Sequence, residues 1–129
     1  MVLRLITAHS AKPGTTIMID GEACAVRTND ISKTGKHGAS KCRIEAIEVF
    51  TGKKKVLAVP GDTKFDVPMI EKRKAQVLSV LEDRASVMDL ESYETLEISV
   101  YIEIREKIAP EKQVEYWDIE GKKMIMRVL

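Results

Sequence analysis

The segment TTIMIDGEACAVRTN, residues 15–29, carries the strongest fold signal in the chain. Asp20-Gly21 is a favoured two-residue hairpin turn, because both residues tolerate the positive φ angles that this turn requires. The flanking runs, residues 15–19 and 22–29, contain β-branched and small apolar residues that alternate loosely with polar ones. The segment therefore predicts two antiparallel strands joined by a tight turn.

Similar short runs, separated by turn-forming residues, fill the rest of the chain. Strands are predicted over residues 40–49, 55–59, 64–67, 74–81, 85–90, 94–100, 113–119 and 123–129. A single helical turn is expected within residues 102–108. About five short strands in each half predict an all-β protein made of two small barrels.

The boundary between the barrels is expected at Asp66-Val67-Pro68, because proline blocks the continuation of a strand. The charge balance changes at the same place. Residues 1–68 carry 11 Lys/Arg against 7 Asp/Glu, whereas residues 69–129 carry 10 against 13. The predicted domains are therefore residues 1–68 and 69–129. The positive first half predicts an anionic partner, and a solvated basic surface is the alternative.

The composition indicates a globular, cytoplasmic protein. Hydrophobic residues make up 44% of the chain and aromatic residues 5%, so we expect mostly aliphatic cores. We expect no signal peptide and no membrane partner, because no apolar run is long enough to cross a bilayer. Cys24 and Cys42 lie in alternating runs and are expected to be buried, reduced thiols. Their spacing from the histidines does not fit a zinc site.

The segment SKTGKHG, residues 32–38, is predicted to be an exposed loop between two strands. Gly35 and Gly38 allow positive φ and a close approach by another molecule to the backbone around Lys36. These features favour a loop that contacts nucleic acid. From the residues alone, a solvated turn remains the alternative.

Two enzymatic interpretations of this segment fit poorly. A P-loop needs an earlier glycine and a hydroxyl after the lysine, but Asp30 and His37 occupy those positions around Gly35-Lys36. A Lys36–His37 acid–base pair would sit on an exposed tip, with no pocket to organise it. We therefore expect no catalytic residue, no metal site and no bound cofactor.

The segment 32–38 resembles the hypusine loop of the translation initiation factor 5A family, which is distantly related to bacterial elongation factor P. The similarity extends to VFTGKK (49–54), FDVP (65–68) and VEYWDIEGKKMIMRV (114–128), the last resembling archaeal-type members. Ala39-Ser40 departs from the His-Ala that usually follows in eukaryotic members. The resemblance implies an N-terminal SH3-like barrel and a C-terminal oligonucleotide-binding (OB) fold.

The resemblance also implies that Lys36 is modified to deoxyhypusine or hypusine. In the family, deoxyhypusine synthase uses NAD and transfers an aminobutyl group from spermidine to the lysine side-chain nitrogen. A second enzyme adds a hydroxyl group in some members. The residues that would surround the modified lysine are Ser32, Lys33, Thr34, Gly35, His37 and Gly38.

By the same resemblance, the protein binds the ribosome near peptidyl-transfer RNA and promotes peptide-bond formation, including at stalled sequences. Its expected partners are the ribosome and deoxyhypusine synthase, and not DNA. The candidate RNA-phosphate contacts are Lys41, Arg43, Lys53, Lys54 and Lys55. The alternative is a cytosolic RNA-binding module that acts without modification of Lys36.

The second barrel offers four aromatic rings for base stacking, Tyr93, Tyr101, Tyr116 and Trp117. Tyr116 and Trp117 are adjacent on one predicted strand and must face opposite sides, so only one of them can be in the core; a structural role is expected for both. The net charge of this half argues against an independent nucleic-acid binder. Its expected role is to set how Lys36 is presented.

Overall fold

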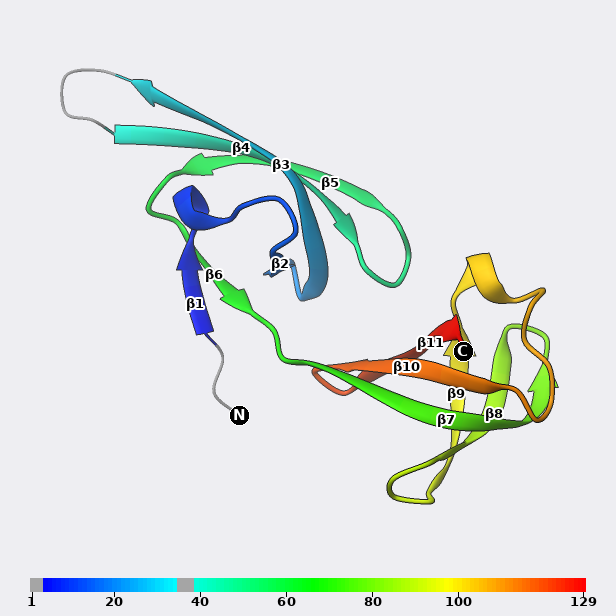
Figure 1. Cartoon of the computed structure of the whole chain (residues 1–129). Helices are drawn as coiled ribbons and strands as arrows, with labels where there is room; N and C mark the ends of the chain where they lie inside the picture. Colours follow the sequence, from blue (N-terminus) through cyan, green and yellow to red (C-terminus); the bar gives the residue numbers. More distant parts are fainter. Residues whose placement is uncertain (1–3, 35–38) are drawn as a thin grey trace. The chain divides into compact units, whose positions relative to one another are not determined.

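A computed structural model describes residues 4–34 and 39–129, and the chain divides into two compact units, Met1–Pro68 and Met69–Leu129 (Figure 1). Within the described ranges, strands dominate and the helical elements are two short 3-10 turns, η1 (Ala8–Ser10) and η2 (Ile102–Ile104). The predicted all-β class is confirmed. None of the described helical segments is long and apolar enough to cross a membrane.

The first unit contains two sheets that share one core. The four-stranded antiparallel sheet has the order β2 (Thr16–Ile19), β3 (Glu22–Thr34), β4 (Ala39–Glu48) and β5 (Lys54–Pro60). A second sheet pairs β1 (Arg4–Thr7) with β6 (Lys64–Val67). Ile6 and Phe65 of the small sheet pack against the buried cluster that includes Ile17, Val26 and Ile44. The two sheets therefore enclose a small SH3-like barrel.

The first predicted hairpin is confirmed. Asp20 and Gly21 both have positive φ, 52° and 79°, and they connect β2 to β3 in a regular antiparallel register. Cys24 and Cys42 are both free and fully buried, as predicted. Burial raises the pKa of each thiol, because the thiolate would be poorly solvated in the core.

Strand β3 is longer than predicted. The sequence placed its end at Asn29, but the strand continues to Thr34 and pairs with β4 as far as Ala39. A register shift between Val26 and Thr28 moves the inward side from even to odd positions. The bulge explains why the alternation of polar and apolar residues in this run is loose.

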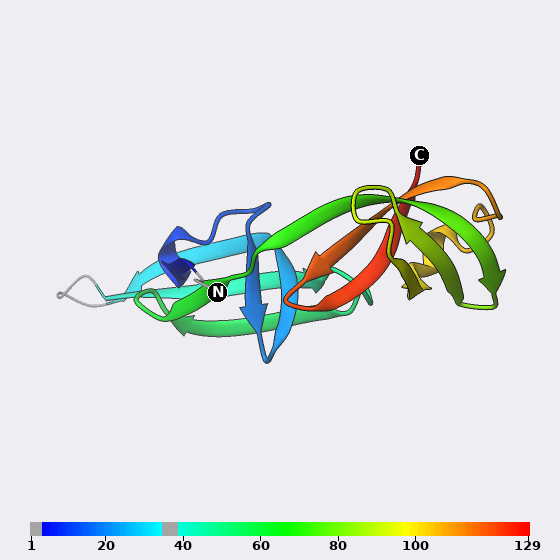
Figure 2. The same ribbon diagram turned by 90° about the horizontal axis from the view of Figure 1, so that it is seen from below.

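The second unit is a closed five-stranded barrel with the order β10-β11-β9-β8-β7 (Figure 2). Its strands are β7 (Ile70–Leu81), β8 (Arg84–Asp89), β9 (Thr95–Val100), β10 (Gln113–Ile119) and β11 (Lys122–Val128). The first three strands form a meander, and β10 returns through a long connection to pair with β7, which is a Greek key. Strand β11 closes the barrel through a short parallel contact with β9. This is the architecture of an OB fold.

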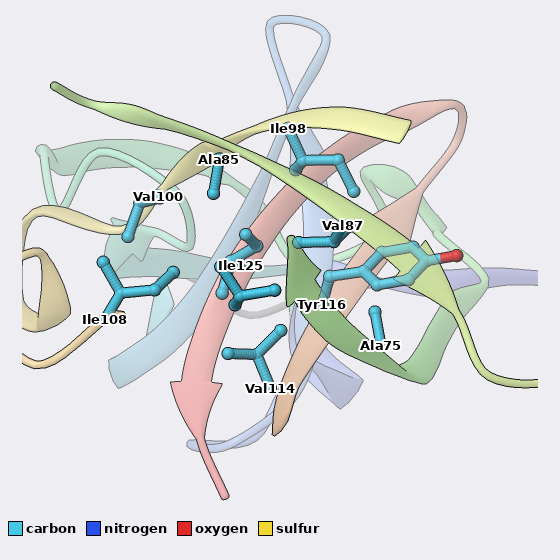
Figure 3. Close-up of a cluster of buried hydrophobic side chains, with 10 residues drawn as sticks. Ala75, Ala85, Val87, Ile98, Val100, Ile108, Val114, Tyr116 and Ile125 are labelled. Atoms are coloured by element: carbon cyan, nitrogen blue, oxygen red, sulfur yellow. The ribbon is translucent and has the colours of Figure 1, made fainter. Parts of the chain in front are cut away.

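The barrel interior is filled by aliphatic side chains and one tyrosine. Figure 3 shows Val87, Val114 and Ile125 among the side chains that meet in this core. Tyr116 is 2% exposed, and its hydroxyl donates a hydrogen bond to the buried carboxylate of Asp89. Tyr116 is therefore the core residue of the Tyr116–Trp117 pair, as the alternation along β10 requires.

Some boundaries differ from the predicted ones. Strand β1 and the turn η1 were not predicted. Strand β7 begins at Ile70 instead of residue 74, directly after the boundary between the units. The helical turn expected within residues 102–108 is present as the three-residue η2.

Candidate functional site

The candidate site is the hairpin formed by β3 and β4. Near its end, Ser32 pairs with Lys41, Lys33 with Ser40, and Thr34 with Ala39. The first three residues of the predicted loop, Ser32, Lys33 and Thr34, thus belong to a strand, which corrects the loop prediction for them. The other four, Gly35, Lys36, His37 and Gly38, lie outside the described residues.

The paired arms of the hairpin continue beyond the packed core of the first unit (Figure 1). Ile31 is 43% exposed, whereas Cys42, directly opposite on β4, is fully buried. Ser32 and Lys33, near the end of β3, are polar and exposed, so burial contributes little to their order. The strand ladder itself holds this part, because each strand satisfies the backbone groups of the other.

A close backbone approach supports the β4 arm at its base. The Gly61 N–H donates to the Ser40 carbonyl at 2.9 Å, and the His9 N–H donates to the Gly61 carbonyl at 3.0 Å. A Cβ atom at position 61 would lie 2.0 Å from Ser40 Oγ and 3.2 Å from Ser40 Cβ, so any other residue there would force the Ser40 side chain to move. The turn after β5 therefore links η1 to the arm that leads to the tip.

A side-chain amide supports the β3 arm. Asn29 Nδ2 donates to the carbonyls of Ala8 and Ala11, both at 2.8 Å. These bonds attach the segment around η1 to β3; the Ala8 carbonyl also accepts from the Ala11 N–H at 3.2 Å. Sequence reasoning missed this contact. The available signal was an asparagine among the last residues of an apolar-alternating run.

The predicted phosphate contacts do not form a single cluster. Arg43 and Lys54 both approach Glu45, with nitrogen–oxygen distances of 3.7 and 3.0 Å. The hydrogen bond from Lys54, with one from Thr28, lowers the pKa of Glu45. These two cations are therefore partly neutralised by a carboxylate on the same face of the sheet.

The other three candidates differ from one another. Lys55 Nζ donates to Glu22 Oε1 at 2.9 Å and to the Ile19 carbonyl at 3.4 Å, and the bond to Glu22 raises the pKa of Lys55. Lys41 and Lys53 are exposed, and their ammonium groups make no ion pair with the described residues. Lys55 thus connects β5 to the first hairpin, whereas Lys41 and Lys53 remain available to a partner.

Comparison with known proteins identifies the family. Residues 5–63 match the family described as translation initiation factor 5A-like, N-terminal. The chain is 45% identical to translation initiation factor 5A of Metallosphaera sedula, and the alignment covers 99% of both chains. The chain belongs to the translation initiation factor 5A family. It is also 43% identical to the Pyrococcus furiosus protein of the same name, over 95% of this chain and 92% of that one.

Solved structures of relatives have the same fold over the whole chain. The factor from Methanococcus jannaschii matches with a TM-score of 0.87 and 38% identity, covering 100% of both chains. A family protein from Naegleria fowleri matches with a TM-score of 0.82 and 26% identity, covering 99% of both. Membership of this family supports a role as a translation factor, and the relatives are named as factors rather than enzymes.

Proposed function

We propose that this member of the translation initiation factor 5A family acts on the ribosome through a spermidine-derived deoxyhypusine or hypusine side chain on Lys36. The observation that carries the proposal is the β3–β4 hairpin, whose paired arms leave the core and lead to the segment that contains Lys36. The proposal also rests on the similarity of residues 32–38 to the family's modified loop.

The chemistry of modification suits a lysine at the end of a hairpin. The lysine amine must lose its proton before it attacks an electrophile, and desolvation in a pocket favours the neutral amine. The hairpin itself offers no such pocket, so deoxyhypusine synthase would supply it. A narrow hairpin can insert its tip into a partner enzyme, because the support at Gly61 and Asn29 lies behind the tip.

On the ribosome, the modified side chain would act by positioning. A longer side chain with two amines, both cationic near neutral pH, could reach the acceptor end of peptidyl-transfer RNA and favour its productive orientation. This would promote peptide-bond formation, including at stalled sequences. Lys41 and Lys53 are the strongest candidates for phosphate contacts, and Arg43 and Lys54 would have to share their charge with Glu45.

The first experiment is an intact mass of the protein purified from its own cells, followed by sequencing of the peptide that contains Lys36. We expect an added aminobutyl group on Lys36, with or without one further oxygen. Lys36→Arg should then abolish the effect on peptide-bond formation in a reconstituted translation assay. Lys64→Arg is the matched control, because it makes the same charge-preserving change at an exposed lysine on β6, outside the hairpin, and should retain activity.

The second candidate function is an RNA-binding module that acts without modification. The exposed cations of the first unit favour it, since they do not depend on Lys36. An unmodified Lys36 in native protein, together with full activity of Lys36→Arg, would replace our proposal with this one.

A further inference from the structure

The outer surface of the second barrel presents an oriented tryptophan. Trp117 on β10 lies opposite Lys72 on β7 and Met124 on β11. Lys72 Nζ is 4.5 Å from the centroid of the Trp117 ring, which is a cation–π contact. The indole N–H donates to Glu115 Oε1 at 3.0 Å. Because the preceding Tyr116 points into the core, Trp117 projects from the outside of the barrel.

Two further cations lie near this ring. In the next row of the same three strands, Glu115 lies opposite Lys74 on β7 and Arg127 on β11. Arg127 Nη1 is 3.9 Å from Glu115 Oε1, and Lys74 makes no ion pair with any described residue. We call this surface the Trp117 face; its members are Lys72, Lys74, Glu115, Trp117, Met124 and Arg127. It carries three cations and one carboxylate, in a unit where acidic residues are in excess.

The opposite side of the barrel has a different character. OB folds commonly bind oligonucleotides on the face of their second and third strands, here β8 and β9. On that face Arg84 donates to the Glu97 carboxylate at 3.0 Å, to the Glu97 carbonyl at 3.0 Å and to Ser99 Oγ at 3.2 Å. A hollow of about 310 Å³ beside Arg84 and Lys123 has no aromatic lining residue. Its arginine is neutralised, and it offers no stacking platform.

We propose that the Trp117 face binds single-stranded RNA, with one base stacked on Trp117 and the phosphates contacted by Lys72, Lys74 and Arg127. Base stacking on an aromatic ring is stronger than an exposed cation–π contact, so a base can displace the Lys72 ammonium from the ring. The flexible lysine stem then allows the ammonium to move to a phosphate. An acidic polypeptide would satisfy the cations but would leave the indole unused.

The choice of RNA rests on the proposed role in translation, but the site does not require a modified Lys36. The face lies wholly within the second unit, Met69–Leu129, whereas Lys36 belongs to the first. The two proposals can therefore fail separately.

The chain contains a single tryptophan, so its fluorescence reports on this face directly. Titration of the full-length protein with oligouridine should quench the emission of Trp117 to saturation, and added salt should reverse the quenching. Lys36→Arg should leave this titration unchanged. Absence of quenching while a labelled oligouridine binds by anisotropy would overturn the proposal, as would loss of the quenching in Lys36→Arg.

Variants test the two parts of the site with labelled oligouridine. Trp117→Leu should weaken binding about tenfold, whereas Trp117→Phe, which keeps a stacking surface, should stay close to wild type. Lys74→Gln should reduce the slope of log affinity against log salt by about 0.7, the value for one phosphate of a single strand. Lys107→Gln removes another exposed cation, in the connection between β9 and β10, and should leave the slope unchanged.

Circular dichroism and urea unfolding of each variant establish that the barrel is intact. Wild-type affinity in a folded Trp117→Leu variant would exclude stacking on this residue. Equal quenching by polyglutamate would show that the face recognises charge alone, and it would replace RNA with an acidic polypeptide as the ligand.

Discussion

Arg73 on β7 and Asp89 at the end of β8 form a bidentate ion pair, with Nε 2.6 Å from Oδ2 and Nη2 3.2 Å from Oδ1, although Asp89 is only 1% exposed. The carboxylate also accepts hydrogen bonds from the Tyr116 hydroxyl and from the backbone N–H groups of Glu91 and Ser92. The guanidinium of Arg73 holds the pKa of Asp89 well below its ordinary value. One buried carboxylate thus joins β7, β8, β10 and the turn after β8.

Removing this charge should destabilise the second unit. Asp89→Asn leaves Arg73 without a carboxylate partner and weakens the hydrogen bond from Tyr116, so we expect a loss of about 3 kcal/mol in unfolding free energy. Urea unfolding followed by Trp117 fluorescence measures this unit specifically. Glu97→Gln, which breaks the exposed pair with Arg84, is the matched control and should cost about 0.5 kcal/mol. Equal losses in the two variants would contradict the assigned role of Asp89.

The same pair should produce acid sensitivity. The pKa of Asp89 is lowered in the folded state, whereas the pKa of an unfolded aspartate is about 3.9. The stabilisation is therefore complete above the unfolded pKa and decreases as the pH falls below about 4 toward the lower folded value. Urea midpoints of the wild type should fall more steeply in this range than those of Asp89→Asn. Parallel pH profiles for the two proteins would refute the prediction.

Tyr116 should affect the alkaline limit of stability. Burial, with a smaller effect of Asp89, raises the pKa of Tyr116 to about 12, whereas an unfolded tyrosine titrates near about 10. The neutral phenol is favoured in the folded state. Its contribution to the free energy of unfolding is therefore complete below about pH 10 and is lost as the pH rises toward 12. Tyr116→Phe should flatten this loss and cost about 1.5–3 kcal/mol near neutral pH, since a bond to a charged acceptor is removed. Ultraviolet titration of phenolate formation and urea unfolding provide the two measurements.

The support of the hairpin at Gly61 can be tested by a double substitution. Gly61→Ala should destabilise the first unit by about 1–3 kcal/mol, because the new methyl group would overlap Ser40 Oγ. Ser40→Gly removes that atom and should recover most of the loss when combined with Gly61→Ala. Ser40→Ala should recover less, since its Cβ would still lie 3.2 Å from the new methyl group. Additive effects in a double-mutant cycle, measured by chemical denaturation, would show that the contact is unimportant.

Asn29 should be sensitive to the chemistry of its side chain more than to its size. Asn29→Ala removes two hydrogen bonds to the carbonyls of Ala8 and Ala11 and should cost about 1–3 kcal/mol. Asn29→Asp places carboxylate oxygens against the same carbonyls and should cost more at neutral pH. The carbonyls disfavour the ionised form in the folded state, so the penalty should decrease as the pH falls toward the unfolded pKa of about 4, where the protonated acid can donate. Thermal unfolding of both variants at two pH values checks the order, and a smaller cost for aspartate would rule out the assigned contacts.

The features that were predicted correctly are those that depend on residues close together in the sequence. The Asp20-Gly21 turn and the opposite orientations of Tyr116 and Trp117 depend on neighbouring residues and on the period of a strand. The contacts of Gly61 with Ser40 and of Asn29 with Ala8 join residues that are 21 positions apart. Only the pairing of whole strands brings these residues together, so no short pattern could reveal them.

The hairpin boundary was misplaced because polarity was interpreted as a loop. Beyond Asn29 the strand β3 has left the core, and its residues need no apolar alternation to remain paired with β4. The sequence also did not reveal which basic residues of the first unit are paired with carboxylates. Lys54 and Lys55 are adjacent in sequence, yet one approaches Glu45 and the other approaches Glu22 on different parts of the sheet.

Neighbouring strands of the second barrel are paired over different lengths. Strands β9 and β11 meet in two residue pairs, Ser99 with Met124 and Val100 with Ile125, whereas the other neighbouring strands share at least five. The barrel therefore has a seam. Any partial opening of this unit should begin there, with β11 separating from β9 while the more extensive pairings of β7 with β8, β8 with β9, β10 with β11 and β7 with β10 remain. Backbone amides along the seam should be the first of the barrel's amides to exchange with deuterated solvent.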